Sequence, residues 1–433
     1  MKRIIIIVLS LSIVFGFIYW KFGPKLSPQK NSGPVTLTYW GLWEDSNLAK
    51  GIISDYQKQH PNVTVNYVRQ SSINYRTRVQ TQIREGVGPD VFMIHNSWLP
   101  MFKADLAPAP KEVFSLSDYR RMFYPVAEQS FVSDNAIYGA PQEIDGLALF
   151  YNEDILQGVG GKVPRNWQEF MDLASKMTVK DSSGQIKTAG AALGATSNVD
   201  HWPDILGLLF LQQPKIDFNN LNTPEAAEVF KFYTSFVTDP KRKSWDINLP
   251  NSTQAFAQGR LGFYFAPSWR AHELRQLNPN LKFKIAPVPQ LSDKQAAWAS
   301  FWGLTVSLRS KNSKEAWDLI KFMTSAEAEK LAYQQASQVR LFGQPYSQTG
   351  LATELGQDPV VGAFVNQGPI YKFWYLSSNT FDAGINDEMI KYFEDGINAV
   401  LGGTDAQTAL QTVDKGVKQV LDKYTKAANP ATG

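Results

Sequence analysis

The chain has no cysteine among its 433 residues and only four histidines. Without cysteine it has no disulfide, no thiolate nucleophile, no Cys-bearing zinc site and no site for a lipid-modified N-terminal cysteine. The histidines, at positions 60, 95, 201 and 272, show no metal-ligand spacing. We therefore predict neither a metal site nor a cofactor.

A charge excess is also lacking, because 43 basic residues are nearly balanced by 40 acidic ones and the net charge is only +3. This balance gives no positive field that would attract nucleic acid, so we predict no nucleic-acid partner. No glycine-rich phosphate loop with a following lysine stands between a strand and a helix, and the string Gly-x-Ser-x-Gly is absent. Nucleotide binding and serine-based acyl transfer have no support.

Aromatic side chains, by contrast, are abundant: they make up 13% of the chain and include 12 tryptophans. With 43% hydrophobic and 19% charged residues, the chain can form two or three domains, each with its own core. Neither repeats nor low-complexity segments account for the aromatic residues. They must therefore lie in cores or on a binding surface.

The N-terminus has the residue order of a secretory signal, with Lys2 and Arg3 before an apolar run from Ile4 to Trp20. At about 1.5 Å per residue the run spans ~25 Å, which is within the range of a membrane-spanning helix. It ends in bulky residues, whereas signal peptidase requires small ones. We predict an uncleaved single-pass transmembrane anchor over residues 1–20, with the body outside the cytoplasm.

The alternative is a cleaved signal, cut near Gly23 or Ser27, which would release a secreted body. Residues 21–34 are rich in glycine, proline and serine, a composition that does not pack. We predict that they form a linker.

Strand and helix patterns alternate along the body, which predicts an α/β fold with a parallel sheet sandwiched by helices. Predicted strands cover residues 35–40, 63–67, 91–94, 147–151 and 261–265. Predicted helices include residues 46–60, 72–84, 254–258, 313–324, 325–335, 386–401 and 404–423, with further helix starts at residues 166, 223 and 268. Ligands of such folds lie beyond the carboxyl ends of the strands.

The order of these segments resembles the extracellular solute-binding proteins of ABC importers, in the large sugar-binding class that includes maltose-binding protein. The resemblance covers nearly all of Val35 to Lys423. Its markers are Tyr39-Trp40-Gly41-Leu42-Trp43, Gly88-Pro89-Asp90-Val91, Tyr138-Gly139-Ala140-Pro141, Leu149-Phe150-Tyr151-Asn152, Trp167-Gln168-Glu169-Phe170, Phe256-Ala257-Gln258-Gly259-Arg260, Pro287-Val288-Pro289 and Ala316-Trp317-Asp318-Leu319-Ile320-Lys321-Phe322.

Two departures from the family pattern stand out. Members from single-membrane bacteria usually carry a lipid-modified cysteine, and its absence here favours the uncleaved anchor. The glycine pair usually found before a late strand is replaced by Phe301-Trp302-Gly303, so we expect a bulkier pocket wall at this point.

The resemblance implies a two-lobed periplasmic-binding-protein-like fold of type II, with the ligand cleft between the lobes. Lobe one would comprise residues 35–142 plus 291–340, and lobe two residues 143–290 plus 341–433. Three crossings would join the lobes and permit hinge closure. They are expected near residues 143–146, 287–290 and 341–346.

Candidate ligand contacts follow the strands. Trp43 comes after the first strand with Glu44 and Asp45 beside it, and an indole face suits the C–H face of a pyranose while carboxylates accept from hydroxyls. The alternative is that Asp45 only caps a helix and Trp43 packs under the lobe. Asn96 and Trp98 follow the strand at 91–94.

Glu143 and Asp145 on the first crossing face the same way if that segment is extended. They could accept sugar hydroxyls or form the carboxylate pair of a glycosidase.

The remaining candidates are aromatic residues in predicted turns and loops. Trp269 matches the family's aromatic residue at this point and is the main stacking candidate. Trp202 stands in a polar loop, Trp302 near the second crossing and Tyr346 on the third. For Trp374 burial and binding are both open, whereas Trp167 and Trp317 lie on apolar helix faces and belong to the core.

The sequence thus predicts a membrane-tethered, monomeric receptor that captures a carbohydrate by closure and delivers it to an ABC permease, without catalysis. Two rival hypotheses remain. One is an extracellular polysaccharide-acting enzyme that uses Glu143 and Asp145. The other is a binding protein for a peptide, a polyamine or a phosphodiester.

Overall fold

A computed structural model of the chain describes residues 33–291 and 295–428. The predicted anchor and nearly all of the predicted linker lie outside these residues. In the described part, no helix combines the length and hydrophobicity needed to cross a membrane. The described residues from Thr36 onward belong to one compact unit.

The first of two five-stranded sheets has the strand order β2-β1-β3-β13-β6. Its strands are β1 (Val35–Gly41), β2 (Val63–Arg69), β3 (Val91–His95), β6 (Ala140–Pro141) and β13 (Trp302–Val306). β3 is buried along its whole length, as its continuous apolar run predicts. It pairs in parallel with β1 and antiparallel with β13, so the chain returns to this sheet after it has built the second one.

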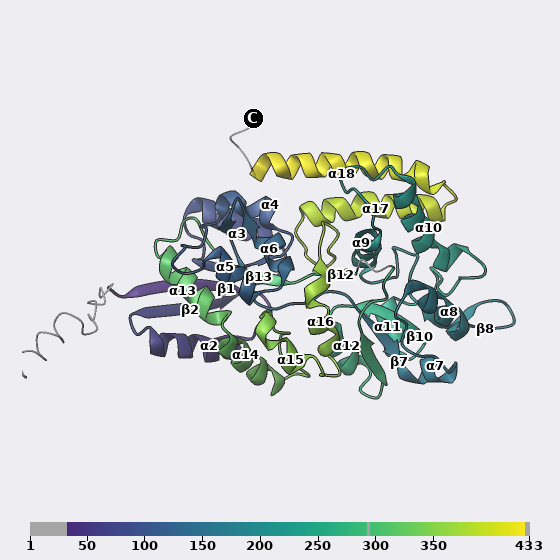
Figure 1. The fold of residues 1–433 in the computed structure, drawn as a ribbon, viewed down its shortest axis with the longest axis horizontal. Coiled ribbons are helices and arrows are strands. Elements are labelled where there is room, and N and C mark those ends of the chain that lie inside the picture. The colour runs from purple at the N-terminus through teal and green to yellow at the C-terminus, as the bar shows by residue number, and fades with distance from the viewer. Residues whose placement is uncertain (1–32, 292–294, 429–433) are drawn as a thin grey trace, which may run out of the picture. The chain divides into compact units, whose positions relative to one another are not determined.

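Helices cover this sheet (Figure 1). They are α2 (Ser46–Gln59), α3 (Tyr75–Glu85), α4 (Leu99–Phe102), α5 (Leu116–Met122), α6 (Pro125–Phe131), α13 (Ser313–Met323) and α14 (Ala326–Ser337). A short 3-10 turn, η1 (Lys103–Asp105), follows α4, and a small hairpin of β4 (Val132–Ser133) and β5 (Ala136–Ile137) follows α6. In α13 the indole of Trp317 is fully buried and donates to the Ala107 carbonyl at 3.1 Å, which confirms its predicted core role.

The second sheet has the order β11-β7-β10-β9-β8. Its strands are β7 (Ala148–Asn152), β8 (Val179–Lys180), β9 (Ile186–Ala191), β10 (Leu261–Ala266) and β11 (Phe283–Ala286). β10 is entirely buried and pairs in parallel with β9 and antiparallel with β7. The helices that follow or cover these strands are α7 (Glu153–Gly158), α8 (Trp167–Met177), α9 (Trp202–Gln212), α10 (Pro224–Thr238), α11 (Ser252–Ala257) and α12 (Arg270–Leu277).

The strands predicted from the sequence are confirmed within one or two residues, as are most of the predicted helices. The prediction of a parallel sheet is wrong, because both five-stranded sheets are mixed: β13 runs antiparallel to β3 and β6, and β7 runs antiparallel to β10 and β11. The expectation of a polar loop around Trp202 is wrong, because α9 begins at this residue with Pro203 in its first turn. Nearly every residue of α9 is buried. A helix that is apolar on all sides lacks the periodic pattern that identifies surface helices.

The chain segments that join the two sheets run side by side. The Leu147 N–H donates to the Trp298 carbonyl at 2.9 Å, the Ser300 N–H to the Asp145 carbonyl at 3.0 Å, and the Ile144 N–H to the Pro345 carbonyl at 3.1 Å. Gly146 lies opposite Ala299, and a Cβ at position 146 would stand 1.9 Å from the Trp298 carbonyl oxygen. Only glycine permits this close approach.

The C-terminal part begins with short elements: η2 (Thr349–Leu351), α15 (Ala352–Leu355), α16 (Gly362–Asn366) and η3 (Gly368–Ile370). η2 contacts α5 and η3 contacts α6, so this stretch, assigned above to lobe two, packs against helices of the first sheet. The two-stranded ladder of β12 (Ala297–Trp298) and β14 (Tyr371–Lys372) follows in the chain. The lobe bounds drawn from the sequence stay predictions.

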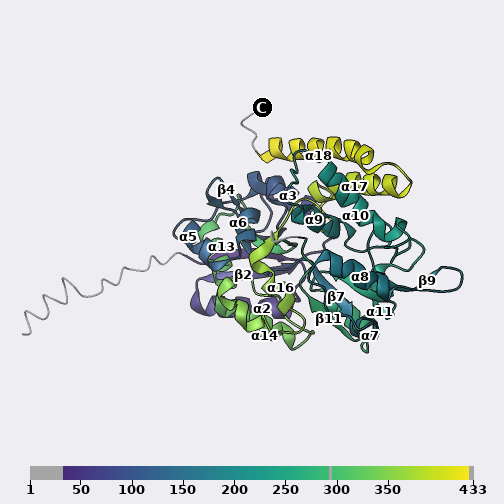
Figure 2. The ribbon, with the colours of Figure 1, turned by 45° about the vertical axis from the view of Figure 1, so that its right-hand side comes forward.

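Two long helices, α17 (Ile385–Leu401) and α18 (Ala406–Ala428), complete the described chain. They lie side by side in both views (Figures 1 and 2). α18 contacts α10 and α17, and it also contacts α4 from the side of the first sheet. The C-terminal helices therefore contact elements on the sides of both sheets.

Candidate ligand-binding site

A cavity of about 440 Å³ is lined by residues from both sheets and from the segments that join them. The first-sheet side supplies Trp43, Glu44, His95 and Trp302, and the second-sheet side supplies His201, Asp204, Ser268, Trp269, Arg270 and His272. The joining segments add Glu143, Asp145, Ser300, Arg340, Phe342 and Gln344, and a late loop adds Ser378, Asn379, Thr380 and Phe381. The volume falls in the range of small-molecule sites.

The first-sheet wall is aromatic. Trp43 follows β1 and meets Trp302, at the start of β13, edge to face with ring centroids 5.9 Å apart. Behind them Trp98 packs edge-on against Trp302 at 5.0 Å, and His95 lies 5.4 Å from the same ring. Trp43 is 42% exposed, so much of its ring is open to a ligand.

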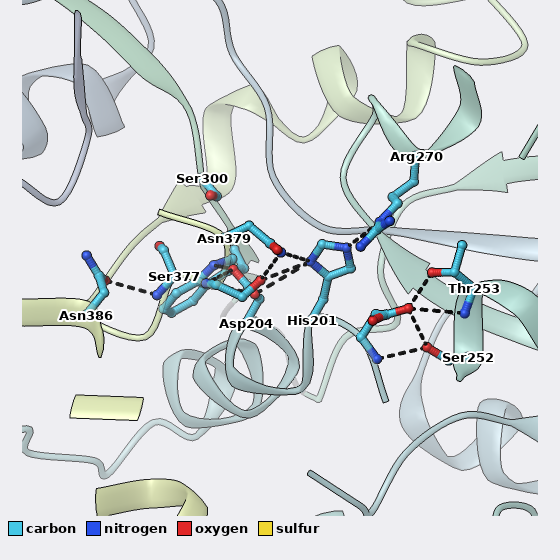
Figure 3. Close-up of polar contacts among 12 residues, drawn as sticks. His201, Asp204, Ser252, Thr253, Arg270, Ser300, Ser377, Asn379 and Asn386 are labelled. Carbon is cyan, nitrogen blue, oxygen red and sulfur yellow. Dashed lines mark hydrogen bonds and ion pairs between the residues drawn. The ribbon is translucent and has the colours of Figure 1, made fainter. Parts of the chain in front are cut away.

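The second-sheet wall combines one tryptophan, Trp269, with a polar network, and Figure 3 shows the contacts of that network. Trp269 is also 42% exposed, and the guanidinium of Arg270 lies 4.4 Å from its ring centroid. Arg270 Nε donates to His201 Nε2 at 3.0 Å. Since an arginine is always a donor, Nε2 carries no proton, and the Nδ1–H of His201 faces Ser378 Oγ at 3.0 Å.

Burial and the nearby charge of Arg270 lower the pKa of His201, which keeps its ring neutral. The next carboxylate of this network, Asp204, accepts from Trp298 Nε1 at 2.9 Å and from the Ser378 N–H at 3.1 Å. Burial nevertheless raises the pKa of Asp204 to about 6. The wall therefore presents fixed donors and acceptors with little net charge.

The two carboxylates on the first crossing, Asp145 and Glu143, differ in their hydrogen bonds and in their exposure to the cavity. Asp145 accepts from the Gly146 N–H at 2.7 Å and from Ser268, through its N–H at 3.1 Å and its hydroxyl at 2.7 Å. Burial raises the pKa of Asp145 to about 7 in spite of these bonds. Glu143 is partly exposed to the cavity, and burial together with the charges of Asp145 and Glu44 raises its pKa to about 8.

Two more histidines border the cavity as neutral rings. His95 lies between Ser97 Oγ at 2.8 Å and Ser300 Oγ at 3.1 Å, and burial lowers its pKa to about 3. His272 stacks on Phe342 at 4.0 Å, and burial together with Arg340 lowers its pKa to about 4. In the described part of the chain, no three histidine or acidic side chains converge as metal ligands would.

Six of the residues proposed from the sequence line this one cavity although they come from four different parts of the chain. They are Trp43, Glu44, Glu143, Asp145, Trp269 and Trp302. Glu44 is held by an ion pair with Arg340 at 3.2 Å and by a hydrogen bond from Gln344 Nε2. Their role as ligand contacts stays a prediction.

The other six do not line the cavity. Asp45 is the N-cap of α2 and accepts from the Asn47 N–H at 2.8 Å. Asn96 is buried, and its Oδ1 accepts from the Phe301 N–H at 3.1 Å, which fixes the end of β3 to the strand-like segment before β13. Trp98 is fully buried behind Trp302 and stacks on Phe102.

Trp202, Tyr346 and Trp374 are likewise buried away from the cavity. Trp202 is the first residue of the buried helix α9. Trp374 stacks on Phe218 with centroids 4.5 Å apart, and Tyr346 borders a smaller neighbouring cavity of about 50 Å³. These aromatic side chains contribute to packing.

The cavity also contains residues that the sequence analysis did not propose, above all His201, Arg270, Arg340 and the loop from Ser378 to Phe381. Two further cavity histidines, His95 and His272, could have been found from the sequence. His95 ends β3 and His272 lies in the helix after β10, and ligand sites of α/β folds form at such strand ends. The loop has no such signal, since it follows a long irregular stretch.

The sequence profile of the bacterial extracellular solute-binding proteins matches residues 41–330, about two thirds of the chain. The chain belongs to this family. Its family relatives are binding proteins, which agrees with the two-lobed fold and the interlobe cavity described above.

A relative from Brucella abortus (strain 2308) is 24% identical over 62% of this chain, and the chain covers 66% of that relative's length. The galactooligosaccharide-binding protein of Bacillus subtilis (strain 168) is 23% identical over 94% of this chain and 92% of its own length. In fold the chain resembles the cyclic α-maltosyl-1,6-maltose binding protein of Arthrobacter globiformis, with a TM-score of 0.73 and 17% identity over 90% of this chain and 100% of that one.

Proposed function

We propose that this protein is a receptor that captures a carbohydrate outside the cytoplasm, encloses it by closure of the two lobes, and delivers it to an ABC permease. The observation that carries the proposal is the pairing of two half-exposed indoles, Trp43 and Trp269, with carboxylates and neutral histidines around a single cavity. Indole faces match the C–H faces of sugar rings, and the polar groups match their hydroxyls.

The character of related proteins supports the same ligand class, because the Bacillus subtilis relative is a galactooligosaccharide-binding protein and the Arthrobacter globiformis neighbour binds a cyclic maltosyl-maltose. The uncharged histidine rings around the cavity also support a carbohydrate ligand. His272, whose pKa is lowered to about 4, presents an uncharged ring at neutral pH. His95, with a pKa of about 3, is buried with both ring nitrogens bonded to serine hydroxyls, so it adds no charge to the site. A neutral polyhydroxylated ligand requires no net charge from its site.

The decisive test is a thermal-shift screen of the full-length chain against maltotriose, maltotetraose, galactooligosaccharides and monosaccharides, followed by calorimetry. A sugar present at 100 times its dissociation constant adds about 2.7 kcal/mol of stability. If the protein bound a peptide, a polyamine or a phosphodiester and bound no sugar of the panel, the proposal would be refuted. Appearance of shortened sugars in product analysis would instead favour the enzyme that uses Glu143 and Asp145.

The membrane tether is a separate part of the proposal and has its own test. Intact-mass measurement or N-terminal sequencing of protein extracted from membranes is expected to find Ile4 to Trp20 retained. A mature chain that starts beyond residue 20 would contradict the tether and leave the ligand proposal unaffected.

A further inference from the structure

The loop from Ser377 to Gly384, which we call the strap, connects the short ladder of β12 and β14 to α17 and carries four cavity-lining residues, Ser378 to Phe381. Its backbone is unusual. Asn379, Phe381 and Ala383 have φ angles of 58°, 48° and 44°, in the left-handed region that residues other than glycine rarely adopt. Such a conformation persists only where surrounding contacts hold it.

One set of these contacts comes from lobe two (Figure 3). Asp204 accepts from the Ser378 N–H at 3.1 Å, and the hydroxyl of the same serine receives the Nδ1–H of His201. Asn379 Nδ2 donates to Ser378 Oγ at 2.9 Å. The start of the strap is therefore fixed to the N-terminal end of α9.

The other set comes from lobe one. Arg76 on α3 donates from Nε to the carbonyl of Asp382 and from Nη2 to the carbonyl of Ala383, the latter at 3.1 Å. Asn386 Nδ2 donates to Ser97 Oγ at 2.7 Å, and its Oδ1 accepts from the Ser377 N–H at 3.1 Å. The end of the strap is thus fixed to the opposite lobe, outside the three predicted crossings.

Within the strap, Thr380 has a buried hydroxyl without a hydrogen-bond partner, and this residue lines the cavity. A buried hydroxyl without a partner is costly, and a ligand group that bonded to it would remove the cost. The strap therefore brings a residue with an unsatisfied hydroxyl to the wall of the cavity.

We propose that Arg76 is a positioning residue for the ligand cavity: it clamps the strap to lobe one, and this clamp sets how slowly a bound solute dissociates. The proposal rests on the proposed function for the identity of the solute, but not for the existence of the clamp. Arg76 does not itself line the cavity, so it acts through the strap that it holds.

The chain offers a matched control. Arg78 lies two residues further along α3, is half-buried like Arg76, and also donates to two carbonyls, those of Ile73 and Ser71 at 2.9 and 2.6 Å. These carbonyls precede α3 and have no part in the strap. Loss of Arg78 removes two hydrogen bonds to carbonyls, as loss of Arg76 does, without touching residues 377–384. Arg76 has one further bond, from Nη1 to Gln80 Oε1 at 2.8 Å, which lies within α3.

The test uses the full-length chain as Arg76→Met, Arg76→Lys and Arg78→Met variants. Hydrogen exchange of the segment 377–387 is measured without any sugar, and dissociation of the oligosaccharide that binds the unmodified chain most tightly in the panel above is measured by stopped flow. We expect Arg76→Met to accelerate exchange in this segment several-fold and dissociation about tenfold, the scale of a lost charge-assisted hydrogen bond. Arg76→Lys should restore part of both effects, and Arg78→Met should cause neither.

Unchanged exchange at residues 377–387 in Arg76→Met overturns the clamp, and faster exchange with unchanged dissociation overturns its role in retention. Equal effects of Arg76→Met and Arg78→Met show general weakening of α3 and also overturn the proposal. If no oligosaccharide binds the unmodified chain, the proposed function fails, and the sugar-free exchange measurement still decides whether Arg76 holds the strap.

Discussion

The two walls of the cavity present different chemistry to the same space. The first-sheet wall is a packed group of rings in which Trp43 packs against Trp302 and Trp302 packs against the buried Trp98. The second-sheet wall exposes a single indole, Trp269, beside a chain of hydrogen bonds that runs through Arg270 and His201 to the strap.

This difference separates two tasks of a binding site. The aromatic wall is supported by ring packing and supplies apolar contact area, which stabilises a ligand without fixing its orientation. The polar wall supplies directional bonds, which distinguish one arrangement of hydroxyls from another. We therefore expect the aromatic wall to contribute mainly to affinity and the polar wall mainly to the choice of ligand.

The largest expected effect concerns the core of the first-sheet side, away from the cavity. Trp317 lies in α13 against β13, the strand that begins with Trp302, and packs on Phe114. We expect Trp317→Ala to lower the free energy of unfolding by about 3 to 5 kcal/mol, as for other large core truncations. Denaturant titration measures this loss. Calorimetry on the folded fraction should find near-normal sugar affinity, and a large loss of affinity would show that Trp317 supports the site directly.

The next effect tests the carboxylates between the walls. Glu143 has a pKa of about 8 in the folded protein, raised by burial, so the fold binds a proton that the unfolded chain has released above pH 4.5. Stability must then fall as the pH rises toward 8, by about 1.4 kcal/mol per pH unit for one such group. Asp145 and Glu329, with pKa values of about 7 and 8, act in the same direction.

Unfolding measured between pH 6.5 and 8.5 checks this sign. The histidines with lowered pKa act oppositely, because below pH 6.5 the unfolded chain takes up protons that the folded rings do not bind. The window above pH 6.5 therefore isolates the acids. Glu143→Gln should flatten the decline by about 2 kcal/mol over the window. If the free energy of unfolding of this variant declined equally steeply with pH, the decline would have to come from Glu329 or Asp145 instead.

Strands β1, β2, β3, β7 and β10 and most helices could be predicted from the sequence, because apolar patterns and caps such as Asp45 and Asn166 act locally. Strands β9 and β11 and the antiparallel pairings were not predicted, since pairing depends on distant parts of the chain. The six cavity residues found from the sequence follow strands or lie on a crossing. Trp98 and Trp202 were not recognised as buried, and the sequence left Trp374 open, because what covers these rings comes from distant parts of the chain, as Phe218 covers Trp374. The strap was missed for the same reason, since its contacts join Arg76, Asp204 and Asn386.

The comparison of the walls becomes sharper when one indole is removed from each. The exposed part of an indole that stacks on a sugar corresponds to about 1 to 2 kcal/mol, or about tenfold in dissociation constant. We expect Trp43→Ala and Trp269→Ala each to weaken sugar binding by at least this factor in calorimetry. One face of Trp269 is occupied by Arg270, so its loss should also alter which sugars of the panel bind.

Unchanged affinity in Trp269→Ala would remove this residue from the site. The same result for Trp43→Ala would leave the carbohydrate proposal without its main physical support, since this indole is the part of the aromatic wall most open to the cavity.

The smallest expected effect concerns Asp45, next to two cavity residues in sequence but outside the cavity in space. Its carboxylate accepts from the Asn47 N–H and caps α2, and the side chain is exposed. Asp45→Ala should therefore lower the free energy of unfolding by about 1 kcal/mol, as for other N-caps, and leave sugar affinity within twofold of the parent. Asp45→Asn, which keeps an accepting oxygen, should restore most of the stability. If instead Asp45→Ala weakened binding as much as Trp43→Ala while stability stayed unchanged, the aromatic wall would have to extend along the loop to Asp45, and its polar and apolar roles would no longer be divided between the two sheets.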